Sequence, residues 1–162
     1  MFPKLRLRPA ESTDFMLIFN WANDSLTRKM SFNQEPISLE AHEGWFKQVL
    51  SRQILLLVAE AHKSGNWHPI GTFRVGEDGE VSMSLAAEYR GQHLATPVIS
   101  IGIKNLGPTF HKDKLVAHIK KENIASIKAF ERAGFYFVAE AEVRGNPCLE
   151  YIYELSGASD SG

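Results

Sequence analysis

A short loop between an alternating segment and an apolar helical segment carries the residues best suited to hold an anion. Residues 80–85 alternate and predict a strand, whereas residues 94–106 have an apolar period that predicts a helix. The basic loop between them, residues 88–93, would aim backbone N–H groups and the positive end of the helix at one point. Pro97 falls in the first helical turn, where a missing N–H costs nothing. The segment therefore predicts a phosphate site.

Two common phosphate loops do not fit this segment. A Walker loop needs a Lys followed by Ser or Thr, and a dinucleotide loop needs three glycines where this loop has only Gly91. Residues 90–95 instead resemble the Q/R-x-x-G-x-G/A pyrophosphate loop of the GNAT (Gcn5-related) N-acetyltransferases, with Arg90 first and Ala95 last. The departure is His93, where that family usually has Gly. A side chain there could narrow the approach to the pyrophosphate or donate a hydrogen bond to it.

A second segment strengthens the resemblance. Residues 115–119 predict a strand, and Asn123 is a good N-cap for a helix that ends at Gly134, with Phe135 beginning the next strand. This is similar to the GNAT segment in which a strand leads through N-x-x-S/A into a short helix ending in G-F. Two such segments in the right order, about 30 residues apart, are rarely a coincidence. The resemblance spans roughly residues 5–155.

Composition restricts the class of protein. The chain has 162 residues, a net charge of −1 and one cysteine, Cys148. It predicts one domain over residues 1–155, a disordered tail over residues 156–162, no nucleic-acid or membrane partner, and no internal disulfide. We expect a cytoplasmic location. The six histidines and the cysteine show no metal-ligand spacing, so no metal is expected.

The remaining patterns give the element order. Strands are predicted over residues 4–8, 53–61, 69–75, 135–143 and 148–155, and helices over residues 11–22 and 38–49. Turns are predicted over residues 62–68, 77–79 and 144–147, with Arg28 and Phe32 in a loop that ends at Pro36. This order is that of the GNAT fold. The resemblance implies an α/β (α+β) fold with a mixed, mostly antiparallel sheet. That sheet splays between its fourth and fifth strands, has helices on both faces, and holds the cofactor in the notch.

The resemblance also implies a cofactor and a reaction. Relatives transfer acetyl from acetyl-CoA directly to an amine, without an acyl-enzyme. The positions that match the cofactor contacts of the family are Leu85, Arg90, Gly91, Gln92, His93, Leu94, Ala95, Asn123, Ser126 and Phe130.

The acid and the base are less well defined by the sequence. Many relatives carry a Tyr where this chain has Phe130, which cannot donate a proton, and Ser126 is the alternative hydrogen-bond donor to the leaving sulfur. Ser126 is equally well explained as a residue of the first helical turn. The thiolate can also leave towards water. Candidate bases are Glu80, Glu60 and His42, and a chain of waters could replace all three.

The segments before residue 50 are expected to bind the acceptor, because they overhang the notch in this fold. They resemble bacterial nucleotide-amino-sugar N-acetyltransferases, of the UDP-4-amino-sugar type found in pseudaminic acid biosynthesis. Aromatic rings can stack on a base or sugar, and Arg28 can pair with a phosphate. The alternatives are a ribosomal-protein N-terminal acetyltransferase and a non-catalytic acetyl-CoA sensor. The oligomeric state stays open, a homodimer being one option. The predicted acceptor residues are Trp21, Asn23, Arg28, Phe32, His42, Trp45 and Phe46.

Overall fold

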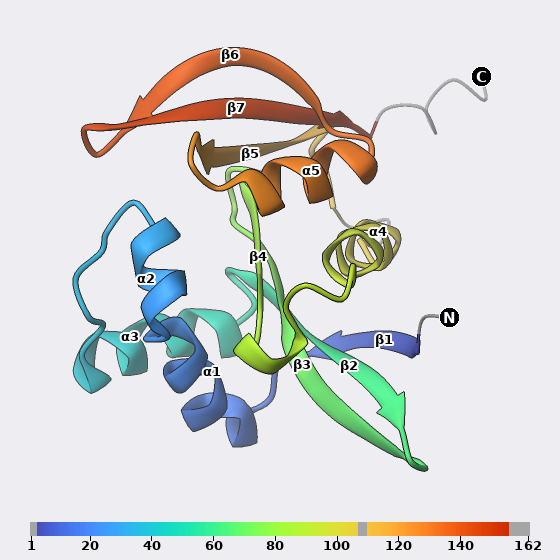
Figure 1. Ribbon diagram of the computed structural model, residues 1–162. Coiled ribbons are helices and arrows are strands. Elements are labelled where there is room, and N and C mark those ends of the chain that lie inside the picture. Colours follow the sequence, from blue (N-terminus) through green and yellow to red (C-terminus); the bar gives the residue numbers. More distant parts are fainter. Residues whose placement is uncertain (1–2, 107–109, 156–162) are drawn as a thin grey trace.

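The computed structural model describes residues 3–106 and 110–155 and places the elements in the predicted order (Figure 1). The strands are β1 Lys4–Pro9, β2 Leu55–Lys63, β3 Asn66–Val75, β4 Val81–Leu85, β5 Lys114–Lys120, β6 Tyr136–Val143 and β7 Asn146–Glu154. The helices are α1 Phe15–Ala22, α2 Ser25–Met30, α3 Leu39–Leu50, α4 Ala95–Lys104 and α5 Ile124–Arg132. Short 3-10 turns, Ser12–Asp14 and Ala87–Tyr89, precede α1 and α4.

The strands form two antiparallel sheets that meet along one short seam. The first has the order β1-β2-β3-β4, and the second has the order β5-β7-β6. The sheets join through a parallel bridge between Glu80 and Val116, where the Val116 N–H donates to the Gly79 carbonyl at 3.0 Å. Beyond this bridge β4 and β5 diverge, which leaves one backbone edge of β4 without a strand partner. The expected splay between the fourth and fifth strands is confirmed.

Helices cover both faces of the first sheet, because β2 is apolar on both sides. Leu57 and Ala59 point into the larger core, which contains residues of α4 and α5. Leu56 and Val58 alternate with them and point into a smaller core with residues of α1 and α3. Figure 1 shows α4 and α5 on one side of β4, and α1 to α3 on the other. The segments predicted to bind the cofactor and those predicted to bind the acceptor therefore approach β4 from opposite faces.

Helix α4 lies unusually close to β3. A side-chain Cβ built at Gly102 would lie 2.6 Å from ring atoms of Phe73, closer than real contacts allow. Phe73 is fully buried beneath it. Only glycine fits at this position without a shift of the helix or the ring.

Three connections differ from the sequence predictions. The turn predicted over residues 62–68 shrinks to Ser64 and Gly65, which have φ values of 53° and 81° and allow β2 and β3 to continue. The polar residues of this hairpin suggested a turn, but they are stabilised across the strands, for example by His62 against Trp67 at 5.0 Å. The hairpin predicted over residues 144–147 likewise shrinks to its first two residues.

The third difference is at Arg28, which lies in helix α2 and not in a loop. Asp24 caps this helix by accepting a hydrogen bond from the Thr27 N–H at 3.1 Å. The tail predicted to be disordered, residues 156–162, lies outside the described residues. Among the residues that are described, none forms a helix long and apolar enough to cross a membrane.

Candidate active site

The loop over residues 90–95 adopts the curled backbone that an anion site needs. Gly91 has φ 75° and His93 has φ 60°, so two residues of the loop lie in the left-handed region. Within residues 3–106 and 110–155, the N–H groups of residues 91–94 find no acceptor. No side chain caps α4 at Leu94. The N–H groups and the positive end of α4 are therefore free to hold a pyrophosphate.

His93 replaces glycine where the backbone still takes a glycine-like conformation. A left-handed φ costs a β-substituted residue roughly 1–2 kcal/mol. The His93 side chain is exposed. The departure from the GNAT motif therefore places an imidazole on the surface of the loop, at a residue whose backbone is left-handed.

The unpaired edge of β4 and the start of α5 flank the split. Leu85 ends β4, and its backbone faces the opening where a cofactor arm could add hydrogen bonds. Asn123 caps α5, as predicted, by accepting from the Ser126 N–H at 3.3 Å. Phe130 is 3% exposed and packs edge-on against Phe135 at 4.9 Å. The aromatic ring at Phe130 is therefore a core residue.

Arg90 does not point its guanidinium into the anion loop. Its Nη2 atom lies 2.6 Å from Asp24 Oδ2, and its Nε donates to the Leu85 carbonyl at 3.2 Å. The hydrogen bond from Arg90 is the main reason that the pKa of Asp24 falls below its ordinary value. Arg90 thus ties the predicted cofactor loop to the capping residue of α2.

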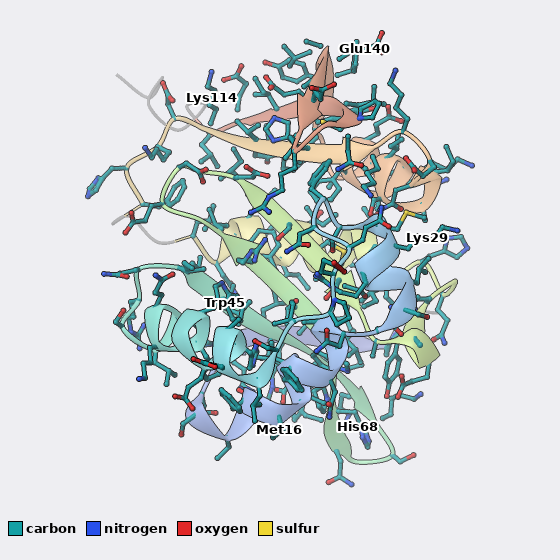
Figure 2. The ribbon with its side chains drawn as sticks, turned by 90° about the vertical axis from the view of Figure 1, so that its left-hand side faces the viewer. Met16, Lys29, Trp45, His68, Lys114 and Glu140 are labelled. Carbon is teal, nitrogen blue, oxygen red and sulfur yellow. The ribbon has the colours of Figure 1, made fainter. Side chains whose placement is uncertain are left out.

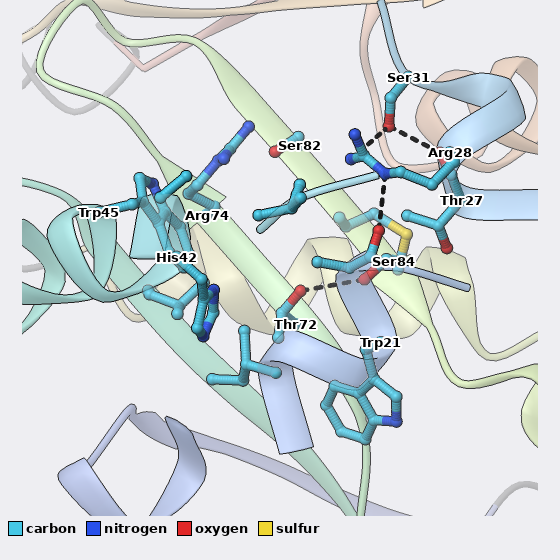
Figure 3. Close-up of a pocket in the computed structure, with 16 residues that line it drawn as sticks. Trp21, Thr27, Arg28, Ser31, His42, Trp45, Thr72, Arg74, Ser82 and Ser84 are labelled. Atoms are coloured by element: carbon cyan, nitrogen blue, oxygen red, sulfur yellow. Dashed lines mark hydrogen bonds between the residues drawn. The ribbon is translucent and has the colours of Figure 1, made fainter. Parts of the chain in front are cut away.

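A pocket of about 380 Å³ lies on the acceptor side of β3 and β4. Figure 2 shows α3 with Trp45 and α2 with Lys29 in front of the green strands, and Figure 3 shows the pocket between them. Helices supply its apolar wall and the two strands supply a polar floor. The residues that line it are Ile18, Trp21, Ala22, Thr27, Arg28, Ser31, Ile37, Ala41, His42, Trp45, Leu56, Thr72, Arg74, Ser82, Met83 and Ser84.

Four of the seven predicted acceptor residues line this pocket: Trp21, Arg28, His42 and Trp45. The other three have structural contacts instead. Asn23 braces the segment before α3, accepting from the Ile37 N–H at 2.7 Å and donating to its carbonyl at 2.9 Å. Phe46 is a core residue at 2% exposure. Phe32 lies outside the lining, with the Lys120 ammonium 6.0 Å from its ring centroid.

Most of the N–H donors of Arg28 make hydrogen bonds within the protein itself. Its Nε donates to the Ala22 carbonyl at 2.7 Å, and its Nη1 donates to the carbonyls of Asn33 and Glu35 at 2.7 and 3.2 Å. Burial, together with the charge of Arg74, lowers the pKa of Arg28. Arg28 mainly braces α2 and the loop that follows it, which leaves little of its guanidinium for a phosphate.

Arg74, which sequence reasoning missed, supplies the available cation. It extends from β3 beside Trp45, with its guanidinium carbon 6.0 Å from the ring centroid (Figure 3). Among the described residues its guanidinium makes no hydrogen bond. The alternation of Thr72 with Arg74, and of Ser82 with Ser84, was the available signal, because alternate strand residues share a face. These pairs lie opposite each other in the sheet, Arg74 facing Ser82 and Thr72 facing Ser84.

The candidate bases lie in three different environments. His42 is 2% exposed, and its Nε2 lies 3.0 Å from the Phe15 carbonyl. Burial lowers the pKa of His42, so a neutral imidazole forms part of the pocket wall. Glu60 lies away from the pocket, in ion pairs with Arg6 at 2.7 Å and Arg8 at 3.2 Å. Glu80 begins the seam between the sheets, 3.4 Å from His118.

Cys148 is buried on β7, and we expect it to be dispensable for chemistry. Burial, followed by the negative charges of Glu150 and Glu80, raises the pKa of this thiol, so it stays protonated and a poor nucleophile. Cys148→Ala should keep the turnover of the natural chain, measured by thiol release from acetyl-CoA. An acetyl-cysteine isolated by mass spectrometry, or a folded but inactive variant, would establish a covalent route.

The fold, the curled loop and the split sheet together define an acetyltransferase domain of the GNAT type. The chain belongs to this family: the profile described as Acetyltransferase (GNAT) domain matches residues 4–136.

Individual proteins resemble the chain in sequence or in fold. The chain is 27% identical over 157 residues to an uncharacterised protein of Methanocaldococcus jannaschii, covering 94% of this chain and 31% of that protein. A crystal structure of a domain from the same organism superposes with a TM-score of 0.80 at 24% identity, over 94% of this chain and 99% of that one. The spermidine N-acetyltransferase of Vibrio cholerae, in complex with CoA and spermine, superposes with a TM-score of 0.78 at 20% identity, over 94% of this chain and 96% of that one. The chain spans less than a third of the length of the curated relatives that it matches.

Proposed function

We propose that this chain transfers acetyl from acetyl-CoA directly to the amine of a nucleotide-linked amino sugar held in the pocket over β3 and β4. The observation that carries the acceptor class is the charge of the pocket. Its lining contains two arginines and, within the described residues, no Asp or Glu. Such a lining favours a ligand with a negative group, as in a sugar diphosphate.

The cofactor would lie across the split on the opposite side of β4. Its pyrophosphate would bind the N–H groups of residues 91–94, and its arm would run along the unpaired edge towards Leu85. This course brings the thioester to the strand whose other residues, Ser82 and Ser84, line the pocket. A neutral amine positioned there can attack the thioester carbon directly, so the protein needs only to orient it and to remove its proton.

The pocket contrasts with what a polyamine requires. A polycation such as the spermine bound by the Vibrio cholerae relative would be repelled by Arg74 and would find no carboxylate partner in this lining. Trp21 and Trp45 instead offer flat apolar surfaces on which a base or a sugar face can stack. Thr72, Ser82 and Ser84 add hydroxyl groups to the floor, suited to sugar hydroxyls.

The cofactor part of the proposal is tested by ligand-dependent melting. Acetyl-CoA at about 100 times its dissociation constant should add roughly 2.7 kcal/mol to the free energy of unfolding, whereas ATP and NAD should add nothing. Stabilisation by ATP alone would contradict the assignment of the loop.

The acceptor part is tested with a panel of amines and with two variants, each of which removes one cationic side chain. We expect thiol release with UDP-linked amino sugars and little with the free sugars or spermidine, because remote binding energy positions the amine. Arg74→Ala should raise KM for the nucleotide sugar about 10- to 100-fold, the value of a charge-assisted hydrogen bond. Lys47→Ala, which removes an exposed cation of α3 outside the pocket, is the matched control.

The panel also separates the alternatives. Acetylation of ribosomal-protein N-terminal peptides in preference to sugars would favour the peptide acetyltransferase. Tight acetyl-CoA binding with no acceptor turned over would favour the sensor. Equal KM values for the nucleotide sugar in the natural and Arg74→Ala chains would contradict the inference that the charge of the pocket selects the acceptor.

A further inference from the structure

Two hydroxyl groups on the pocket floor lie next to each other, one on each of the strands that form the floor. Thr72 of β3 and Ser84 of β4 are opposite each other in the sheet register. Their oxygen atoms, Oγ1 and Oγ, lie 3.1 Å apart and share one hydrogen bond, which Figure 3 shows as a dashed line. Both residues line the pocket and are half-buried. They are here called the hydroxyl pair.

A glycine beside the hydroxyl pair brings its two strands close together. Gly71 precedes Thr72 and lies opposite Leu85 in the register. A Cβ built at Gly71 would overlap the Ser84 carbonyl oxygen and would lie 3.1 Å from the Leu85 Cα. Only a residue without a side chain allows β3 and β4 to approach in this way. The backbone that carries the two hydroxyl groups is therefore tightly packed on both strands.

Most of the hydrogen-bonding capacity of the hydroxyl pair is unused within the protein. A hydroxyl group has one O–H donor and two acceptor lone pairs. The bond between Thr72 and Ser84 occupies one donor and one lone pair, and neither oxygen makes a further hydrogen bond to the described residues. One O–H donor and three lone pairs are therefore left for a ligand in the pocket.

The hydroxyl pair is the part of the floor closest to the end of β4. Ser84 directly precedes Leu85, whose backbone edge faces the split between the two sheets. Arg74 and Ser82 form the next pair on the same face, about 7 Å further along the strands. A ligand whose negative group binds Arg74 would therefore place a group one sugar ring away over the hydroxyl pair.

The charges around the hydroxyl pair favour a neutral amine over an ammonium. The lining holds Arg28 and Arg74 and, within the described residues, no carboxylate. Burial lowers the pKa of His42, so its ring is neutral. The charges of Glu80 and Asp78 act on Arg74 from outside the lining. Hydroxyl oxygens accept N–H hydrogen bonds without adding negative charge, so they suit the uncharged nucleophile that attacks a thioester.

We propose that the hydroxyl pair orients the acceptor amine, its oxygens accepting the two N–H bonds so that the nitrogen lone pair points at the thioester carbon. This inference rests on the proposed function. The hydroxyl pair contributes position and does not act as a base. The C–N bond forms and the C–S bond breaks. One amine proton leaves to water, and the departing thiolate takes up one proton to become CoA–SH, so the transfer is balanced.

Removal of either hydroxyl group should lower kcat with little change in the KM for the acceptor. Thr72→Val, which preserves the shape of the side chain, and Ser84→Ala should each lower kcat about 10- to 100-fold, because a misplaced amine reacts slowly. The KM should change by less than about threefold, since Arg74 still binds the remote part of the acceptor. This is the opposite of the effect expected for Arg74→Ala. Thr13→Val, at an exposed position before α1, is the matched control.

Two further variants distinguish orientation of the amine from a structural contact between strands. Thr72→Ser keeps the hydroxyl group and should restore kcat to within about threefold of the natural chain. The double variant, Thr72→Val with Ser84→Ala, should lose little more than either single variant, because two groups that act as a unit are not additive. A Thr72→Ser chain as slow as Thr72→Val, or losses that multiply in the double variant, would overturn the proposal.

The result for the hydroxyl pair can be separated from the result for the proposed function. If the chain acetylates a different amine, the proposed acceptor is refuted, and the same variants are measured with that amine. An unchanged kcat in Thr72→Val and Ser84→Ala, with an acceptor that the natural chain uses, refutes the role of the hydroxyl pair alone. If no amine in the panel is acetylated, both proposals are refuted.

Discussion

Phe73→Ala is expected to lower the free energy of unfolding by about 3–5 kcal/mol, towards the upper end of large-to-small core substitutions. Phe73 is fully buried under α4, directly below Gly102. A cavity is costly when its walls cannot collapse, and a glycine has no side chain with which to fill the space. Urea unfolding followed by tryptophan fluorescence measures the loss, since the chain has three tryptophans.

The same substitution should weaken acetyl-CoA binding, because α4 carries the anion loop at its N-terminus. Phe137→Ala removes an aromatic ring that is 50% exposed on β6 and serves as the matched control, with an expected change within about 0.5 kcal/mol. A loss below about 1 kcal/mol for Phe73→Ala would mean that α4 moves down onto β3 and closes the void.

Asp14→Asn is expected to cost about 3 kcal/mol, the value of breaking a buried ion pair. Asp14 is 5% exposed, and Arg8 donates to both of its carboxylate oxygens, at 2.8 and 3.0 Å. The Glu11 N–H donates to the same carboxylate at 2.7 Å. Glu43→Gln, an exposed carboxylate of α3, should change the free energy of unfolding by no more than about 0.5 kcal/mol.

The contribution of Asp14 should depend on pH in a definite direction. Burial alone raises the pKa of Asp14, but the hydrogen bonds from Arg8 and from the Glu11 N–H outweigh it, and the folded-state pKa lies below the ordinary value of 3.8. The stabilisation is therefore complete above pH 3.8 and is lost as pH falls through the folded-state pKa. The difference in the free energy of unfolding between the natural chain and Asp14→Asn should be largest at pH 7 and should shrink below about pH 4. If this difference stays constant with pH, the effect of the substitution comes from packing and not from charge.

Local sequence patterns predicted those parts of the site that a single short segment of the chain forms. The Asn123 cap, the positive φ at Gly134 and the curled loop of residues 90–95 each depend on a few neighbouring residues. Their chemistry can be read from the sequence because caps and left-handed turns have strong residue preferences. The element order followed from the same cap and turn signals, whereas the split between β4 and β5 was implied by the resemblance to the GNAT family and is confirmed.

Residues whose role depends on strand register could not be predicted in this way. Arg74 enters the pocket only because β3 pairs with β4 so that it lies opposite Ser82. Thr72 meets Ser84 through the same register, 12 positions away in the chain. Arg28 was predicted as the phosphate ligand, yet its guanidinium donates to backbone carbonyls, whose positions cannot be read from residue types.

The ion pair between Arg90 and Asp24 connects the predicted cofactor loop to helix α2 beside the pocket. Asp24 caps α2, whose residues Thr27 and Arg28 line the pocket proposed for the acceptor, and Arg90 starts the loop proposed to bind the cofactor. A ligand that fixes the position of Arg90 or of Asp24 also changes the conformation to which the other ligand binds. By reciprocity, any factor by which acetyl-CoA improves acceptor affinity must equal the factor by which acceptor improves acetyl-CoA affinity. We therefore expect heterotropic cooperativity between the two substrates, transmitted by the Arg90–Asp24 ion pair.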